Sequence, residues 1–276
     1  MLLKMALNPK EKEEIKKFLS RKLEIKLKSY KADGSAKPFL EALVSTPTAR
    51  EASFIHSLYT LIGGKVAEKL IEIIATPRFQ EVVPQKKING KLSTKASEKI
   101  REILQDLGRL GNDPKKRKPN AAKESAEILK LSKGVGAFEE DITDLYLRRK
   151  KEEFLIELKT AKPNKKGSKD FKRDILRFRA MSQENFFTLK IYVGMLYNPY
   201  WPNEYRWWTP LNYLDRKYEL LIGEELWDFV GGKGTYNDLL GTIKGVADEY
   251  APLIQAKIKE IRNKAYEVEK ELRAVV

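Results

Sequence analysis

Apolar residues along this chain change from a helical spacing to a strand spacing near the middle, and return to a helical spacing towards the end. Apolar positions three and four residues apart predict three helices in the first part of the chain, at residues 9–30, 53–75 and 95–110. Between the second and third of these helices, residues 76–90 contain two prolines and are predicted to form a loop. The first part of the chain is therefore predicted to be helical.

The centre of the chain carries short runs of β-type residues. Residues 142–147 and 154–160 flank a charged segment and predict a β-hairpin, and residues 186–196 predict a third strand. Apolar residues on both faces of 154–160 indicate a central strand that is covered on both sides. Helical spacing returns in four segments, at residues 165–181, 217–230, 235–248 and 250–273. This order predicts an α/β fold with a small mixed sheet and helical additions at both ends.

The composition narrows the possible chemistry. The chain has 276 residues with no Cys and one His, which excludes thiolate metal sites and sites built from several histidines. Any metal must therefore be held by oxygen ligands, which suit Mg²⁺ or another hard cation. No apolar run is long enough to span a membrane, and the first residues lack the pattern of a secretory signal, so we expect a cytoplasmic protein.

The charge points to the kind of partner. Lys and Arg number 54 and Asp and Glu number 39, so the formal net charge is +15. Abundant Lys and Glu without Cys is typical of proteins from hyperthermophiles, which explains the amount of charge but not its sign. The positive sign favours a polyanionic partner, and nucleic acid is the commonest one.

Three charged residues of the predicted hairpin suggest a catalytic site. Glu157 and Lys159 are one residue apart on a strand, so their side chains project from the same face. If the hairpin turns at Lys150 and Lys151, Asp144 lies opposite Glu157. Directly opposed Cβ atoms are about 5 Å apart. Two carboxylates that close repel one another unless a divalent cation lies between them, and Lys159 could then contact the bound water or phosphate. The alternative is an ordinary Glu–Lys pair on an edge strand.

Asp144 followed by Glu157-Leu158-Lys159 resembles the PD-(D/E)xK nuclease pattern, with Thr143 in the position of the proline. The resemblance extends over about residues 35–240, where the order of segments is similar to that of small type II restriction endonucleases that recognise GGNCC, a group with thermophilic archaeal members. It implies an α/β/α nuclease core, a Mg²⁺ cofactor, double-stranded DNA with a short palindromic site, and a homodimer. It also implies a cognate DNA methyltransferase in the same restriction-modification system, which is not a physical partner.

The resemblance assigns roles to individual residues. Asp144 and Glu157 correspond to the metal ligands, and Lys159 to the catalytic lysine. Glu68, four residues after Gly64, corresponds to an acid that such enzymes often supply from the first core helix, although the position also fits an exposed helical glutamate. Asp141 is the second candidate for the metal-ligand role given to Asp144; otherwise it is a solvated turn residue.

Basic and amide side chains are candidates for contacts with DNA. Lys162 follows the catalytic strand and could touch a backbone phosphate. The run that contains Lys115, Lys116 and Arg117 is either a solvated turn or an arm that contacts phosphates. The aromatic segment after the third strand either packs against the core or supplies base contacts, for which the candidates are Asn203, Arg206 and Asn212.

We therefore interpret residues 1–276 as a single restriction-endonuclease-like domain, with a catalytic core over about 53–196 and a helical recognition region over about 197–276. The expected activity is Mg²⁺-dependent, site-specific hydrolysis of double-stranded DNA. The alternatives are a Holliday-junction resolvase or repair nuclease on the same core, and a DNA-binding protein that does not catalyse.

Overall fold

The computed structural model describes residues 6–31, 38–109, 111, 113–159 and 161–275. The chain forms two compact units, one made of Met1–Val66 with Asn237–Val276 and the other of Ala67–Tyr236. The second unit contains the whole β-sheet and both predicted catalytic strands. The single domain with a core over 53–196 stays a prediction.

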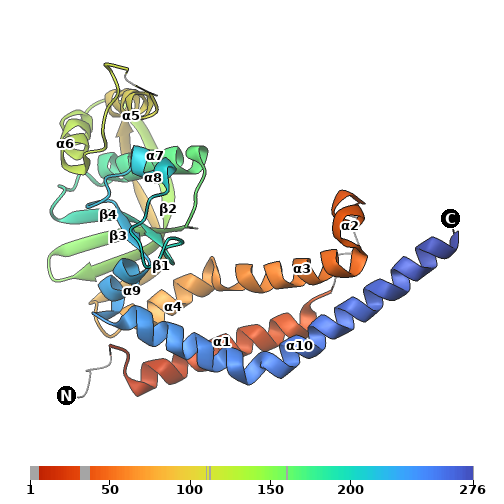
Figure 1. Ribbon diagram of the computed structural model, residues 1–276. Helices are drawn as coiled ribbons and strands as arrows, with labels where there is room; N and C mark the ends of the chain where they lie inside the picture. Colours follow the sequence, from red (N-terminus) through yellow and green to blue (C-terminus); the bar gives the residue numbers. More distant parts are fainter. Residues whose placement is uncertain (1–5, 32–37, 110, 112, 160, 276) are drawn as a thin grey trace. The chain divides into compact units, whose positions relative to one another are not determined.

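The first unit is helical. Its helices are α1 (Pro9–Ser29), α2 (Pro38–Val44), α3 (Thr46–Tyr59), a 3₁₀ turn at Thr60–Ile62, and most of α10 (Thr235–Val275) (Figure 1). Helix α1 begins at Pro9, as predicted, because Asn8 and Glu11 form a reciprocal capping box at its start. The predicted helix over 53–75 is interrupted, because α3 ends at Tyr59 and α4 (Lys65–Ala75) begins after Gly64. Gly64 has a φ of 52°, a conformation that a glycine adopts without strain.

Helix α10 is longer than the sequence predicts. The two predicted helices over 235–248 and 250–273 are one helix of 41 residues, with Pro252 inside it. A proline removes one backbone hydrogen bond, but the helix buries apolar side chains on both sides of it, among them Val246 and Ile261. Across the described residues, no helix combines the length and apolarity needed to cross a membrane.

The second unit is built on a five-stranded sheet with the strand order β1-β2-β3-β4-β5. The strands are β1 (Glu81–Ser93), β2 (Gly136–Arg149), β3 (Glu152–Lys159), β4 (Leu189–Met195) and β5 (Leu220–Ile222). β2 runs antiparallel to both of its neighbours, β1 and β3, whereas β3, β4 and β5 run parallel to one another. This confirms the predicted mixed α/β sheet and the central place of the strand that ends at Lys159; Thr160 lies outside the described residues.

Two predicted elements of this unit are wrong. Residues 76–90, predicted as a loop, contribute most of β1. Pro84 is tolerated there because β1 is the edge strand, where a missing N–H does not interrupt the sheet. The predicted helix over 217–230 is the short strand β5 followed by α9 (Glu224–Gly231). β5 pairs only through three residues, which is too short for a strand period to stand out in the sequence.

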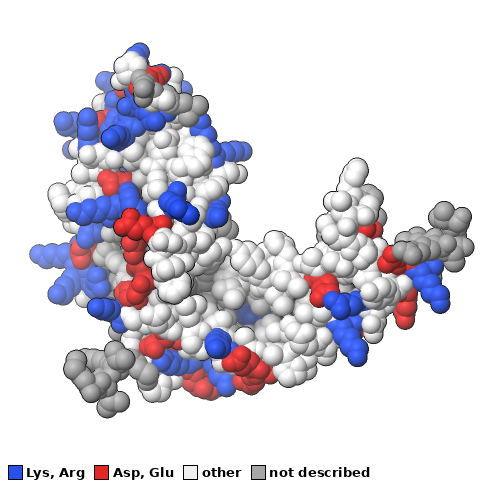
Figure 2. Space-filling view, viewed as in Figure 1, with Lys and Arg blue, Asp and Glu red and all other residues white. Residues whose placement is uncertain are grey.

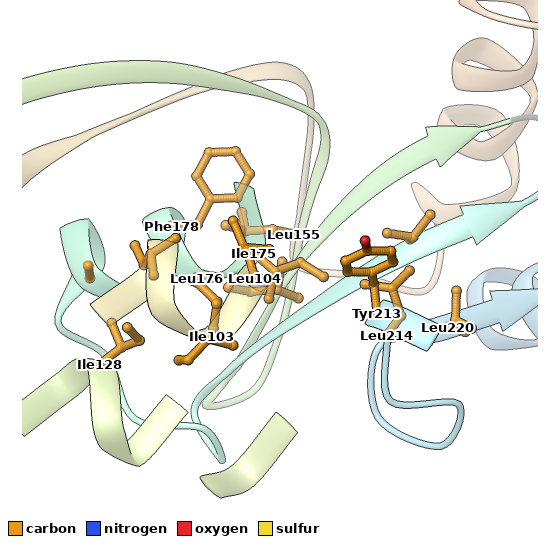
Figure 3. Close-up of a cluster of buried hydrophobic side chains, with 14 of the residues drawn as sticks. Ile103, Leu104, Ile128, Leu155, Ile175, Leu176, Phe178, Tyr213, Leu214 and Leu220 are labelled. Atoms are coloured by element: carbon orange, nitrogen blue, oxygen red, sulfur yellow. The ribbon is translucent and has the colours of Figure 1, made fainter. Parts of the chain in front are cut away.

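Helices cover both faces of the sheet. One face carries α5 (Thr94–Leu107), α6 (Ala121–Leu131), α7 (Lys165–Ser182) and α8 (Trp208–Tyr213). Figure 3 shows Leu104 of α5 and Ile175 of α7 beside Leu155 of β3 in the main core. On the other face, Phe154 packs against Phe79 and against Phe229 of α9, with ring centroids 6.1 and 5.0 Å apart. The central strand is therefore buried on both sides, which limits where a charged residue can stand on it without a partner.

Candidate active site

The β2–β3 hairpin has the register predicted from the sequence. Leu145 pairs with Ile156 and Arg149 pairs with Glu152, so the turn lies at Lys150 and Lys151. Lys150 has a φ of 57°, as one residue of a tight two-residue turn requires. The same register, extended one step beyond Leu145, aligns Asp144 with Glu157.

Asp144 is tied directly to the β3 segment that carries the other two residues. Its Oδ2 atom accepts a hydrogen bond of 2.8 Å from the backbone N–H of Leu158. Leu158 lies between Glu157 and Lys159, so this bond fixes the carboxylate of Asp144 beside both. The bond lies just past the last backbone pair of the hairpin, where the side chain continues the link between the strands.

Lys159 joins the two carboxylates. Its Nζ atom lies 2.6 Å from Oε1 of Glu157 and 3.8 Å from Oδ2 of Asp144. The ammonium group also lies 5.7 Å from the ring centroid of Phe171 on α7, so α7 covers this face of β3. All three charged side chains are half-buried. The three residues predicted from the sequence therefore form one cluster at the end of β3.

Burial sets the protonation behaviour of this cluster. Burial, followed by the charge of Asp144, raises the pKa of Glu157 to about 6, against the opposing effect of Lys159. Burial also acts to lower the pKa of Lys159, but the hydrogen bond and charge of Glu157, with the charge of Asp144, outweigh it and raise that pKa. Lys159 is therefore a cation at neutral pH, and the two carboxylates are held close against their mutual repulsion.

A third acid, Glu68, is linked to this cluster through a residue that the sequence analysis missed. The side-chain nitrogen of Gln85 on β1 donates to Oε2 of Glu68 at 3.0 Å and to Oδ1 of Asp144 at 3.2 Å. Glu68 lies in the first turn of α4, so the amide connects α4 to β2. Gln85 was missed because its segment was predicted to be a loop; a strand there would have aligned it with Asp144.

Asp141, the second candidate for the role of Asp144, has a different partner. Its Oδ2 atom lies 2.6 Å from the guanidinium of Arg177 on α7, which also contacts Glu139 at 2.7 Å. The Asp141 carboxylate is thus engaged in an ion pair between β2 and α7. Asp144 is the aspartate that contacts the segment Glu157–Lys159.

The donor set of the cluster suits a hard cation. Within the described ranges, no group of three or more His, Asp or Glu side chains has the geometry of a metal site. Asp144 and Glu157 nevertheless offer carboxylate oxygens beside the same ammonium group, and Mg²⁺ typically takes one or two carboxylates and keeps several waters. The residues present therefore fit Mg²⁺ held in part by water and by substrate phosphate.

The predicted DNA-contact residues near β3 are held by aromatic rings. The Nζ atom of Lys162 lies 4.9 Å from the ring centroid of Tyr200 and 5.4 Å from that of Trp207. Arg206 lies over the same Tyr200 ring, with its guanidinium carbon 5.0 Å from the centroid. The indole N–H of Trp207 donates to the carbonyl of Pro163, which fixes this segment against the chain that follows β3. The aromatic cluster thus packs on the core and also positions two exposed cations.

The other candidates, apart from Lys115, line a groove of about 1030 Å³. Its lining includes both predicted segments, with Lys116, Arg117, Asn203 and Asn212 among the residues. Arg117 makes a two-pronged contact with Glu127, and Asn212 donates to the backbone carbonyl of Leu107. Lys115, Lys116 and Asn203 are exposed. The side chains of Arg117 and Asn212 therefore have structural partners already, whereas the others face outward.

The groove and the catalytic cluster lie at the same end of the sheet, where the parallel strands have their carboxyl ends. Parallel strands end at one edge, and Lys159 is the last residue of β3. Asn198 and Trp201 follow β4, and Glu224 follows β5; all three line the groove. In open α/β sheets the carboxyl edge is the usual place for ligands. Figure 2 shows many Lys and Arg side chains on the visible face of this unit, with Asp and Glu among them.

This fold and this cluster define a candidate nuclease, and comparison with known proteins gives the family. Residues 4–247 match the family described as "Type II restriction endonuclease, HinfI". The chain belongs to this family of type II restriction endonucleases, which are site-specific DNA endonucleases. The resemblance found in the sequence is thereby confirmed at the level of the family.

Individual relatives agree with this assignment. The chain is 26% identical over 259 residues to the type II restriction enzyme HgiEI of Herpetosiphon aurantiacus. The aligned region covers 86% of this chain and 93% of the relative. It is 25% identical over the same length to HgiCII of that organism. It is also 28% identical to the type II restriction enzyme MjaII of Methanocaldococcus jannaschii, over 71% of this chain and 55% of the relative.

Proposed function

We propose that this protein cuts both strands of double-stranded DNA at a short palindromic site, with Mg²⁺ as cofactor and with the cluster on β2 and β3 as its PD-(D/E)xK active site. GGNCC is the proposed site. The observation that carries the proposal is the contact of the Lys159 ammonium with both carboxylates, 2.6 Å from Glu157 and 3.8 Å from Asp144.

Each residue has a distinct role in this proposal. Asp144 and Glu157 would hold the cation, and the N–H of Leu158 fixes the Asp144 carboxylate beside Glu157 and Lys159. A bound Mg²⁺ would polarise the scissile phosphate and lower the pKa of its water. Lys159 donates hydrogen bonds to the attacking water or to a phosphate oxygen, and its raised pKa keeps it protonated while it does so. Glu68, linked to Asp144 through the Gln85 amide, would add negative charge near the cation.

The duplex would lie along the carboxyl edge of the sheet. Lys162 and Arg206, both fixed over aromatic rings, are proposed to contact DNA near the cut phosphate. Lys116 and Asn203, which line the groove, would also contact the duplex, together with the adjacent Lys115. A palindromic site presents the same bases to two identical subunits, so one active site per strand requires a homodimer.

A plasmid digestion tests the proposal. Supercoiled plasmid of known sequence is incubated with the protein in Mg²⁺ and, in parallel, in EDTA, and the ends of the products are sequenced. Discrete fragments with identical ends in Mg²⁺, and intact plasmid in EDTA, support a site-specific endonuclease; ends within GGNCC support that site. Random ends, or cleavage confined to four-way junctions added to the reaction, would favour a repair nuclease or resolvase. DNA binding without cleavage would favour a protein that does not catalyse.

A further inference from the structure

Gln85 has an unusual backbone conformation for its position. It lies within β1, yet its φ is 52°, in the left-handed region that residues other than glycine rarely adopt. The flanking residues pair normally with β2, Pro84 with Leu145 and Lys86 with Thr143. The distortion is therefore confined to one residue, and that residue lies across the ladder from Asp144.

The conformation has a consequence for the side chain. A left-handed residue within a strand redirects its side chain relative to the alternation of its neighbours. Here the amide of Gln85 meets Asp144 of β2 and Glu68 of α4 at the same time. A conformation that costs free energy persists only where the surroundings require it, and such residues cluster at functional sites.

The amide nitrogen of Gln85 connects the carboxylates of Glu68 and Asp144. It carries two hydrogens, and the geometry gives one to Oε2 of Glu68 at 3.0 Å and the other to Oδ1 of Asp144 at 3.2 Å. Because the Leu158 N–H holds Oδ2 of Asp144, the two oxygens of that carboxylate are fixed from opposite strands. Loss of the amide would leave Asp144 held from β3 alone, and would leave Glu68 without this link to the site.

We propose that Gln85 is a positioning residue of the active site: it orients the Asp144 carboxylate and holds Glu68 beside it, so that the cation-binding oxygens are arranged before the metal arrives. The inference rests on the proposed function and deepens it. Gln85 acts through the two acids and does not contact the reacting atoms. Partners of this kind typically contribute 10- to 100-fold to metal affinity or activity.

The test replaces Gln85 with Gly in the full chain. Glycine accepts the left-handed conformation, so the variant removes the amide and relieves the backbone strain together. Gln183→Gly is the matched control, because Gln183 also has a positive φ, of 57°, but caps the end of α7 and is exposed. The first measurement is Mn²⁺ binding without DNA, followed by the electron paramagnetic resonance signal of free Mn²⁺. The others are the Mg²⁺ dependence of plasmid cleavage and the melting temperature.

We expect Gln85→Gly to weaken Mn²⁺ binding by about tenfold and to raise by a similar factor the Mg²⁺ concentration needed for half-maximal cleavage, with no fall in melting temperature. Gln183→Gly should match the wild type in Mn²⁺ and Mg²⁺ dependence. In a Glu68→Gln background, the effect of Gln85→Gly should shrink, because part of its action passes through Glu68.

The inference and the proposed function fail in different ways. If Gln85→Gly binds Mn²⁺ and responds to Mg²⁺ like the wild type, Gln85 is an ordinary strand residue and the inference is overturned, whatever the enzyme does to DNA. If the wild type cleaves no DNA while Gln85→Gly still weakens Mn²⁺ binding, the proposed function is overturned and the positioning role stands. An equal loss in the Gln183→Gly control would overturn the positioning role as well.

Discussion

The Oδ2 atom of Asp144 accepts a hydrogen bond of 2.8 Å from the backbone N–H of Leu158, the residue between Glu157 and Lys159. The bond forms one step beyond Leu145 and Ile156, the last backbone pair of the hairpin. It holds a carboxylate of one strand against the charged pair of the next, where two acids would otherwise repel one another. Asp144 is therefore placed by β3 as much as by its own strand.

This hydrogen bond predicts different roles for Asp144 and the nearby Asp141. Asp144→Asn should reduce cleavage about a thousandfold or more, because removal of a ligand charge costs several kcal/mol of transition-state stabilisation. Asp141→Asn should stay within a few-fold of the wild-type rate, because Asp141 is paired with Arg177. Single-turnover cleavage of a fragment with one site measures both. A dead Asp141→Asn and an active Asp144→Asn would show that the roles are reversed.

A buried ion network between α6, α7 and the residue before β5 should control stability. Lys172 of α7 is fully buried and contacts Glu124 of α6 and Glu219, which precedes β5. Burial acts to lower the pKa of Lys172, but the charges of Glu219 and Glu124 outweigh it and raise that pKa, so the lysine stays charged. The network joins α6, α7 and the start of β5.

Lys172→Met should therefore destabilise the protein strongly. It leaves two buried acids without their shared cation, which costs about 3–5 kcal/mol. Lys169→Met, an exposed position on the same helix, is the control and should change the free energy of unfolding by less than about 0.5 kcal/mol. Urea unfolding followed by circular dichroism measures both. A Lys172→Met variant as stable as Lys169→Met would mean that the three charges do not interact as described.

The effect of replacing each candidate base-contact residue should depend on whether its side chain already has a partner within the protein. Arg206 and Asn203 are exposed, so alanine at a residue that contacts a base should weaken cognate binding by about 1–3 kcal/mol and leave non-specific binding nearly unchanged. Asn212 already donates to the carbonyl of Leu107, so Asn212→Ala should instead lower the melting temperature. Fluorescence anisotropy with cognate and scrambled duplexes in Ca²⁺ measures binding. Wild-type discrimination in both Arg206→Ala and Asn203→Ala would exclude them as base contacts.

The sequence predicts the hairpin well because its geometry is local. The charged segment between two β-type runs limits the turn to a few residues, and a two-residue turn fixes the register of every pair that follows. That register aligned Asp144 with Glu157 and placed Lys159 on the same face. The alignment of a catalytic cluster within one hairpin is thus available from residue spacing alone.

Contacts between distant segments were less accessible. Pro84 and the lysines of β1 hide an edge strand, because such a strand needs neither a continuous apolar face nor every N–H. Without β1, nothing in the sequence connects Gln85 to Asp144, which is 59 residues away, or to Glu68. The groove was missed for the same reason, because its lining comes from segments far apart in the chain.

The measurement that most directly tests the central claim is cleavage by Lys159→Ala. In the presence of Mg²⁺, this variant should cut a single-site duplex at least about a thousandfold more slowly than the wild type. Its binding to the same duplex in Ca²⁺ should be nearly unchanged, and Lys162→Ala, which alters a neighbouring exposed cation, should retain most of the wild-type single-turnover rate once DNA is saturated. A Lys159→Ala variant that binds and cuts like the wild type would contradict the assignment of the active site to the cluster of Asp144, Glu157 and Lys159.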